Sequence, residues 1–541
     1  MHSGTRRRAL IVFVCLLSGF NCLLTTAAAQ QKMSSNDTGN EIKLGKVNFP
    51  TSCSRQVAAS FNEAVALLAS FQYDFSRKVF AEVAKTDPRC AMAFWGEAMS
   101  LYHQLWMGPN AKTLQQGLAD IKTAERLGLR TKRESGYIEA AAIFYQDNPA
   151  MNNEARAIAY SEAMAALHRR FPQDENATAF YALSLLAVRT ENQAQNLSRR
   201  TLAISILNRL YQQEPDNPAV AHYLIHATDT PELAHLGLNA ARRYAKIAPD
   251  APHALHMPSH IFTQLGMWQE SIQSNLASIA AAEKNTKSQM DDESGDEIHA
   301  LSFLEYAYLQ TGRAREAQNA VGLLKAVPGA SDEDISNYET MFAAEYLEET
   351  HQWKEAASFS PHSGNYPMMQ VQAYCVRAIG EARTGDLAGA RTDIENLRNA
   401  FKAMPMAMTG MMHAAQSPGG SLDELAAEAW LAFAEGDADG AVAKMNAAAS
   451  HGGSSFRVDG VPGVPMREML GDLLLELHRP SEALAAYVSV LKESPNRFNS
   501  LYGAGRAARL TGNTVEAAHY FAELRRICAS GADRPELLTL D

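Results

Sequence analysis

The segment RPSEALAAYVSVLKESPNRFNSLYGAGRAARLTGNTVEAAHYFAEL (residues 479–524) decides the fold. Its apolar residues recur at the three- and four-residue spacing of one helical face. Pro495 separates one helical unit from the next, and Gly512 marks a turn within the second unit. The small residue Ala517 stands five positions after this turn. The segment therefore predicts paired helices joined by tight turns.

The pairing of a turn residue with a small residue five positions later recurs through the C-terminal half of the chain. The pairs are Gly266 and Ser271, Gly312 and Ala317, His351 and Ala356, Gly385 and Ala390, Gly436 and Ala441, His478 and Ala483, and Gly512 and Ala517. Successive turns lie 46, 39, 34, 51, 42 and 34 residues apart. Two of these spacings match the period of about 34 residues that tetratricopeptide repeats have, and the longer ones indicate inserted loops.

The chain resembles a tetratricopeptide-repeat (TPR) protein over about residues 55–530. It is also similar to an exported bacterial branch of such proteins, in which a tyrosine-rich helix ends in an isoleucine-histidine step and an HMPSHI segment follows. The matching stretches here are AHYLIHA (221–227), HMPSHI (256–261) and PNRFNSLYGAGRAA (495–508). The resemblance implies an all-α fold, a TPR-like α-solenoid in which antiparallel helix pairs form a right-handed superhelix. It implies no reaction.

The first 29 residues are predicted to be a signal peptide. Arg6, Arg7 and Arg8 precede an apolar stretch (9–24), and three alanines (27–29) form the cleavage pattern. The apolar stretch is short for a membrane span, although a retained anchor is the alternative, and no later segment is apolar for long enough to cross a bilayer. We therefore expect the mature protein in the periplasm or outside the cell.

The net charge bears on the partners. It is −11 for the precursor, and removal of the three arginines leaves about −14 (−11 − 3). An acidic surface repels nucleic acid and anionic lipid. We therefore expect no nucleic-acid partner, and the oligomeric state stays open.

The remaining chain is predicted to divide into four parts. These are a disordered lead-in (30–50), N-terminal TPR-like repeats (51–282), an acidic loop (283–297) and C-terminal TPR-like repeats (298–541) with long loops at 404–421 and 450–465. Four cysteines follow the signal peptide: Cys53, Cys90, Cys375 and Cys528. Because Cys53 and Cys90 bracket the first helical unit, they are the favoured disulfide pair, with buried free thiols as the alternative.

Histidines are the main functional signal. Six of the sixteen lie within residues 222–260, where an even spread would place about one. They are His222, His226, His235, His253, His256 and His260. Two pairs have the i, i+4 spacing that puts both rings on one helical face, and Pro258 is expected to kink or delay the second helix. Neighbouring first helices of a TPR array line its concave face about 8–10 Å apart, so the two pairs are expected to converge there.

Three interpretations of this cluster stay open. In one, His222, His226, His256 and His260 bind copper or zinc, for which neutral imidazole is a good ligand. In another, the groove binds a protein, peptide or small ligand without metal. In the third, the histidines only make structural hydrogen bonds. Residues expected along the groove are Tyr223, His253, His299, Glu305 and Tyr306. Binding of a partner or ligand is the leading function, and a metalloprotein or metalloenzyme is the alternative.

No recognised catalytic motif is present. HYLIH (222–226) lacks the glutamate of HExxH, so Glu305 or an acid from 291–297 would have to replace it in space. GAGRAA (503–508) fits a loose dinucleotide string but follows no strand. The sequence therefore leaves enzymatic activity undecided.

A second signal for copper is a methionine-rich segment. Met404, Met406, Met408, Met411 and Met412 precede His413. Thioethers select monovalent copper, but methionines also fill helix faces and apolar loops. The favoured interpretation is such filling, and the segment makes copper the first metal to test.

Overall fold

The computed structural model describes residues 42–106, 108–128, 131–190, 192–287, 293–362, 366–404, 416–417, 420–450, 453–455, 460–528 and 531–540. The predicted signal peptide lies outside these residues. All the helices belong to one compact unit, Lys43–Asp541. The predicted all-α class is confirmed: beside the helices, the described residues form only one short hairpin, β1 (Gln416–Ser417) with β2 (Gly420–Ser421), and a single isolated bridge between Ser454 and Pro465.

Among the described residues, fourteen helices lie between Ala58 and Gln310. They are α1 (Ala58–Ala69), α2 (Tyr73–Thr86), α3 (Ala91–Met99), α4 (Ala111–Arg126), α5 (Lys132–Tyr145), α6 (Asn153–Arg170), α7 (Glu175–Ala187), α8 (Gln193–Gln213), α9 (Pro218–Thr228), α10 (Ala234–Ile247), α11 (Pro252–His256), α12 (Pro258–Gln264), α13 (Trp268–Lys287) and α14 (Ser294–Gln310). Short 3₁₀ helices, Arg55–Val57 and Pro535–Thr539, lie near the two ends of the described chain.

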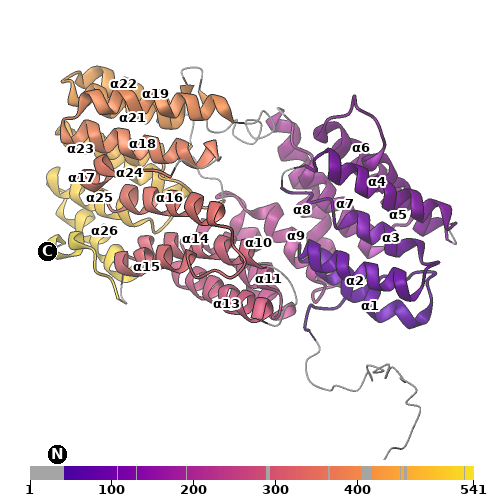
Figure 1. Cartoon of the computed structure of the whole chain (residues 1–541). Helices are drawn as coiled ribbons and strands as arrows, with labels where there is room; N and C mark the ends of the chain where they lie inside the picture. Colours follow the sequence, from indigo (N-terminus) through magenta and orange to yellow (C-terminus); the bar gives the residue numbers. More distant parts are fainter. Residues whose placement is uncertain are drawn as a thin grey trace, which may run out of the picture. The chain divides into compact units, whose positions relative to one another are not determined.

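The helices that follow continue the pattern. They are α15 (Ala314–Leu324), α16 (Asp332–Glu349), α17 (Trp353–Ser358), α18 (Pro367–Thr384), α19 (Leu387–Ala403), α21 (Leu422–Ala434), α22 (Ala438–Ser450), α23 (Met466–Glu476), α24 (Pro480–Glu493), α25 (Phe498–Leu510) and α26 (Thr514–Ile527). Consecutive helices pack against one another, mostly as antiparallel neighbours (Figure 1), whereas α11 and α12 are separated only by Met257.

The turn pattern that the sequence predicts is confirmed. All seven predicted turn residues have a positive φ: Gly266, Gly312, His351, Gly385, Gly436, His478 and Gly512. The small residue five positions after each turn is buried in every case. A left-handed residue reverses the chain between two helices, and the small residue lets those helices approach closely. The protein is therefore a TPR-like helical solenoid.

Phe71 is a further turn residue, outside the pattern of glycines and histidines. It joins α1 to α2 with a φ of 58°, and the buried Ser76 follows five positions later. The first helix pair therefore uses the same device as the later ones. A bulky side chain in this left-handed region is unusual, and the surrounding contacts must hold it there.

The prediction of a disordered lead-in is wrong for residues 43–50. Leu44 and Phe49 are buried, and Phe49 packs against the aromatic rings of Phe61, Trp95 and Tyr137. These apolar contacts and a backbone hydrogen bond from Lys46 to the carbonyl of Asp216 tie the segment to the helices. Residues 30–41 lie outside the described part of the chain.

The prediction of an acidic loop over 283–297 is wrong at both ends. Helix α13 extends to Lys287, and α14 begins at Ser294. Charged residues do not prevent helix formation when they lie on a solvated face or have polar partners. Glu293, directly before α14, is buried and accepts a hydrogen bond from Gln72. Residues 288–292 lie outside the part of the chain that the structure describes.

Long-range contacts join helices far apart in sequence. Helix α1 packs on α9, and α25 packs on α14. At the second junction the buried Arg497 makes ion pairs with two buried carboxylates, Glu349 and Glu468, and donates a hydrogen bond to Tyr306. Each junction brings a loop or turn from one repeat against a helix several repeats away.

The cysteine and methionine predictions have different outcomes. Cys53 and Cys90 form the predicted disulfide, and Cys375 and Cys528 are buried free thiols. Met404 is buried in the core around α18–α24, whereas the other methionines of that segment and His413 lie outside the described residues.

No helix among the described residues is both long and apolar enough to cross a membrane.

Candidate metal centre

Local sequence positions the first histidine pair. Asn217 caps α9 by accepting a hydrogen bond from the backbone N–H of Ala219, and Pro218 occupies the first turn, where its missing N–H costs nothing. His222 and His226 are then one helical turn apart. The Nδ1 atom of His222 lies 2.7 Å from the carbonyl oxygen of Ala69, at the end of α1. The α1–α9 junction therefore fixes the orientation of this ring.

Pro258 shapes the second pair in the way that the sequence predicts. Helix α11 ends at His256, and α12 begins at Pro258, because the proline cannot donate a hydrogen bond to the preceding turn. His256 and His260 still face one another across the break, with their Nε2 atoms 3.0 Å apart. The break thus leaves the pair intact.

The histidines assemble into two triads. The first triad is His222, His226 and His253, and the second is His256, His260 and His299. Within each triad one nitrogen per ring lies within 4.8 Å of the others. In the first triad the Nε2 atom of His222 is 3.0 Å from that of His226 and 3.2 Å from that of His253. Two nitrogens bound to one tetrahedral ion at about 2.0–2.1 Å lie about 3.3 Å apart, so these separations fit shared ligation.

The two triads are neighbours. The ring centroids of His226 and His260 are 6.2 Å apart, and those of His253 and His256 are also 6.2 Å apart. The corresponding distances within the triads run up to 6.4 Å. The six rings therefore form one cluster with two centres.

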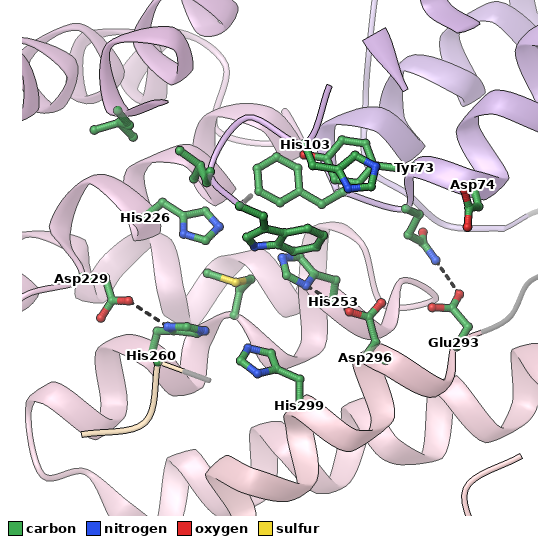
Figure 2. A pocket seen from close by; sticks show the side chains of 18 of the residues that line it. Tyr73, Asp74, His103, His226, Asp229, His253, His260, Glu293, Asp296 and His299 are labelled. Atoms are coloured by element: carbon green, nitrogen blue, oxygen red, sulfur yellow. Dashed lines mark hydrogen bonds and ion pairs between the residues drawn. The ribbon is translucent and has the colours of Figure 1, made fainter. Parts of the chain in front are cut away.

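A pocket of about 640 Å³ opens beside the cluster. His226, His253, His260 and His299 line it, whereas His222 and His256 are fully buried behind them. Figure 2 shows the four lining rings turned toward a shared space, with the stacked rings of Tyr73 and His103 on another side. Each triad therefore presents two rings to the pocket and one to the interior.

Oxygen atoms lie beside the outer nitrogens of three further rings. His256 Nδ1 lies 2.7 Å from Asn275 Oδ1, and His260 Nδ1 lies 2.8 Å from a carboxylate oxygen of Asp229 (Figure 2). His253 Nδ1 lies 3.4 Å from a carboxylate oxygen of Asp296. Outer-sphere acceptors of this kind orient histidine ligands and fix the tautomer that leaves Nε2 available.

The pKa shifts of three rings agree with the neutral form. Burial, and then the neighbouring histidines, hold the pKa values of His222, His226 and His256 well below the ordinary value. Burial alone would raise the pKa of Asp229, but the charge of His260, hydrogen bonds from His260 and Gln264, and the charge of Arg200 lower it overall. Neutral imidazole is the form that binds metal.

Aromatic rings cover the first triad. The ring centroid of Phe71 lies 4.3 Å from that of His222, 5.4 Å from that of His226 and 5.6 Å from that of His253. Trp106, 47% exposed, approaches His253 edge to face at 6.1 Å. Water therefore has little access to this triad from that side.

The predicted residues separate into two groups. The four predicted metal ligands lie in the cluster, but in different triads, and His253 and His299, expected along the groove, complete the triads. Tyr223 is buried beside His222. Glu305 and Tyr306 are buried on α14 and do not line the pocket, and Tyr306 contacts Arg497 instead. His235 is exposed and belongs to neither triad.

Sequence reasoning missed several residues of the site. Phe71, Trp106, Arg189 and Arg200 line the pocket but carry no periodic signal. Asp229 stands directly after α9, three residues beyond His226. Its negative charge so close to a histidine was the signal in the sequence that could have placed it in the site.

No protein-family model matches the chain, and no curated protein matches it. The fold resembles that of a human IFIT1 dimer with m7Gppp-AAAA, at a TM-score of 0.39 and 12% identity over 86% of this chain and 95% of that chain. It also resembles Naa15/Naa10 bound to HypK-THB, at a TM-score of 0.23 and 13% identity over 86% of this chain and 70% of that chain. At these identities and scores the likeness bears on neither ligand nor partner. The fold and the site together define a TPR-like helical-repeat protein with six clustered histidines.

Proposed function

We propose that this chain is an exported helical-repeat metalloprotein that holds two metal ions, one in each histidine triad, with copper the first metal to test and zinc the second. The observation that carries the proposal is the 3.0 Å separation of the Nε2 atoms of His256 and His260. Both rings donate through Nδ1 to oxygen acceptors, so in their neutral forms both Nε2 atoms carry lone pairs. In those forms neither ring can donate to the other, and a metal ion bound by both nitrogens would stabilise the pair.

The first triad supports the same conclusion. His222 Nδ1 faces a backbone carbonyl, which only accepts, so its Nε2 also carries a lone pair. Two further imidazole nitrogens lie 3.0 and 3.2 Å from it. The single lone pair of His222 Nε2 can accept one good hydrogen bond from these two rings, whereas one metal ion can bind all three nitrogens.

The chemistry of the ligands indicates which metals the triads can bind. Each triad consists of imidazoles alone, and neither includes a carboxylate or thiolate among the described residues. Imidazole suits copper, zinc, iron and nickel, whereas magnesium and calcium prefer oxygen. Three protein ligands per ion leave a coordination position open, which is the arrangement of reactive sites more than of closed structural ones.

The pocket supports a binding role. Because two rings of each triad line it, a small ligand or peptide in the pocket would reach the open coordination positions. A metal-free groove for a protein or peptide partner is the second candidate. The exposure of Trp106 at this pocket favours it, since aromatic residues are enriched at interfaces.

Two observations support export. The disulfide of Cys53 and Cys90 is typical of an oxidising compartment. The HMPSHI segment carries His256 and His260, so the resemblance to the exported TPR branch falls on the proposed site itself.

Metal analysis of the mature protein, purified from its export compartment and titrated separately with copper and zinc, tests the proposal. The wild type is expected to hold two ions per chain. His226→Ala and His260→Ala are each expected to lose one ion, and the double variant both, because the two residues belong to different triads. His235→Ala is the matched control, since this exposed histidine lies in the same region of sequence.

The contradicting results are equally definite. Binding of less than about half an ion per chain at micromolar metal would refute the metal proposal and leave the partner-binding candidate. Metal that survives the double variant, or that is lost in His235→Ala, would place the ions elsewhere.

A further inference from the structure

Two arginines line the histidine pocket between its aromatic side and the triads. Arg189 Nη2 donates a hydrogen bond to the carbonyl of Leu105, directly before Trp106, at 3.0 Å. Arg200 Nη1 donates to the carbonyls of His226 and Ala227, at 3.2 and 3.0 Å, at the C-terminal end of α9. Both side chains line the pocket. Their backbone partners therefore place one guanidinium by the aromatic side and the other by the first triad.

Both guanidinium groups have unused donors. A guanidinium carries five N–H donors, and the bonds above use one nitrogen of each side chain. Neither arginine forms an ion pair with a carboxylate within the part of the chain that the structure describes, although Asp74, Asp229, Glu293 and Asp296 also line the pocket. Asp229 is held by His260 and Gln264, and Glu293 by Gln72. Asp229 and Glu232 act electrostatically on Arg200 without an ion pair, and Arg189 has only Arg200 as a charged neighbour among the described residues. Both guanidinium groups therefore keep N–H donors for a ligand.

Aromatic rings stand beside the pair. Tyr73 and His103 stack with centroids 4.0 Å apart, and Trp106 meets both rings edge to face at 5.7 Å. Phe71 completes this aromatic side. A volume of about 640 Å³ is in the range of sites for small organic ligands. A flat aromatic ligand fits beside such a wall by stacking or edge-to-face contact.

We propose that the pocket takes a small aromatic ligand bearing one oxyanion group, a carboxylate or a phosphate, which Arg189 and Arg200 bind while its ring packs on Tyr73, Trp106 and their neighbours. Guanidinium groups match the planar, bidentate geometry of these anions. The inference rests on the proposed function, because it names the class of ligand that the metal pocket admits. The anion contact itself needs no metal.

Isothermal titration calorimetry with four probes tests this inference on the mature protein, both after chelation and after metal loading. Benzoate and phenyl phosphate carry the ring and the anion, benzamide is the neutral analogue of benzoate, and inorganic phosphate lacks the ring. Benzoate or phenyl phosphate is expected to bind at least about tenfold more tightly than benzamide and inorganic phosphate. The tighter of the two identifies the oxyanion.

Substitutions locate the contact. Arg189→Gln and Arg200→Gln are each expected to weaken binding of the preferred probe about tenfold to a hundredfold, the range for hydrogen bonds to charged groups. Arg200→Lys keeps the charge and one donor direction, so it is expected to weaken binding less than Arg200→Gln. Arg243→Gln, which removes an exposed arginine on α10 outside the pocket, is the control and is expected to bind like the wild type. An unchanged circular-dichroism spectrum and thermal midpoint in each variant show that the fold is intact.

The outcomes separate this inference from the proposed function. Equal binding of benzoate and benzamide, or wild-type binding by both glutamine variants, overturns the anion subsite even if two metal ions are bound. Equal binding of phenyl phosphate and inorganic phosphate overturns the aromatic part. Arginine-dependent binding of the probe by a chain that takes up no metal upholds the subsite and refutes the metal proposal.

Discussion

Replacing Phe71 with glycine sets two opposing effects against each other. The left-handed backbone at φ 58° destabilises a non-glycine residue by about 1–2 kcal/mol, and glycine would remove this cost. Glycine is also more flexible in the unfolded chain, which reduces the gain by about 0.5–1 kcal/mol. The ring, however, is only 5% exposed and lies 4.3 Å from the ring of His222. Deleting a buried phenylalanine costs about 3–5 kcal/mol. The expected net loss is about 2–4 kcal/mol.

His478→Gly is the matched control, because His478 occupies the same turn position with a φ of 57° and its side chain is exposed. Only the backbone terms apply there. The expected result is therefore a gain of about 0.5–1 kcal/mol. The two substitutions at equivalent turns should thus change stability in opposite directions.

Amide hydrogen exchange of the metal-free protein measures both effects where they arise, since it reports local opening free energies. Peptides from α1 and α2 should exchange about 30-fold or more faster in Phe71→Gly, because a tenfold change corresponds to about 1.4 kcal/mol. Peptides from α23 and α24 should exchange a few-fold more slowly in His478→Gly. Wild-type or slower exchange around α1 in Phe71→Gly would refute the claim that contacts with the histidine cluster hold this residue in place.

Four further predictions concern stability and metal affinity. Replacing Cys53 and Cys90 with serine should lower the free energy of unfolding by about 4 kcal/mol in denaturant titration, because their bond closes a loop with a sequence separation of 37. Arg497→Ala should cost about 3–5 kcal/mol, since it leaves two buried glutamates without their cation. Burial, with neighbouring carboxylates, raises the pKa of Glu348 from 4.5 to about 8, so the folded state holds a proton that the unfolded state has lost. Stability should therefore fall as pH rises from about 4.5 to about 8, and Glu348→Gln should reduce that loss in thermal melts. Asp229→Asn should weaken metal binding about 10- to 100-fold in competition titrations, because Asp229 orients a proposed ligand.

Each of these has a result that would contradict it. For the disulfide, equal stability of the oxidised wild type and the serine variant would do so. Arg479→Ala breaks an exposed ion pair and should change the free energy of unfolding by less than about 1 kcal/mol. An equally small effect of Arg497→Ala would show that the buried ion pairs do not stabilise the fold. The Glu348 prediction would be contradicted if the stability of the wild type and of Glu348→Gln depended on pH in the same way. The Asp229 prediction would be contradicted if Asp229→Asn bound metal as tightly as the wild type.

The repeat architecture could be predicted because its signals are local. A glycine or histidine at a left-handed turn and a small residue five positions later act within one helix pair, and each such pair is present in the structure. The break at Pro258 and the pairing of Cys53 with Cys90 were similarly local. The turn at Phe71 was missed because a phenylalanine carries no left-handed preference of its own, and contacts with distant histidines determine its conformation.

The amino-acid order alone determined that the chain forms stacked helix pairs and that imidazoles gather on two of them, since periodicity and i, i+4 spacing follow from helix geometry. Only the tertiary structure decided how those imidazoles divide: His253 joins the pair from α9, and His299 from α14 joins the pair at Pro258. That division depends on the packing of α1 on α9 and on the course of the chain between α12 and α14. Such contacts depend on many side chains far apart in sequence, and no local pattern encodes them.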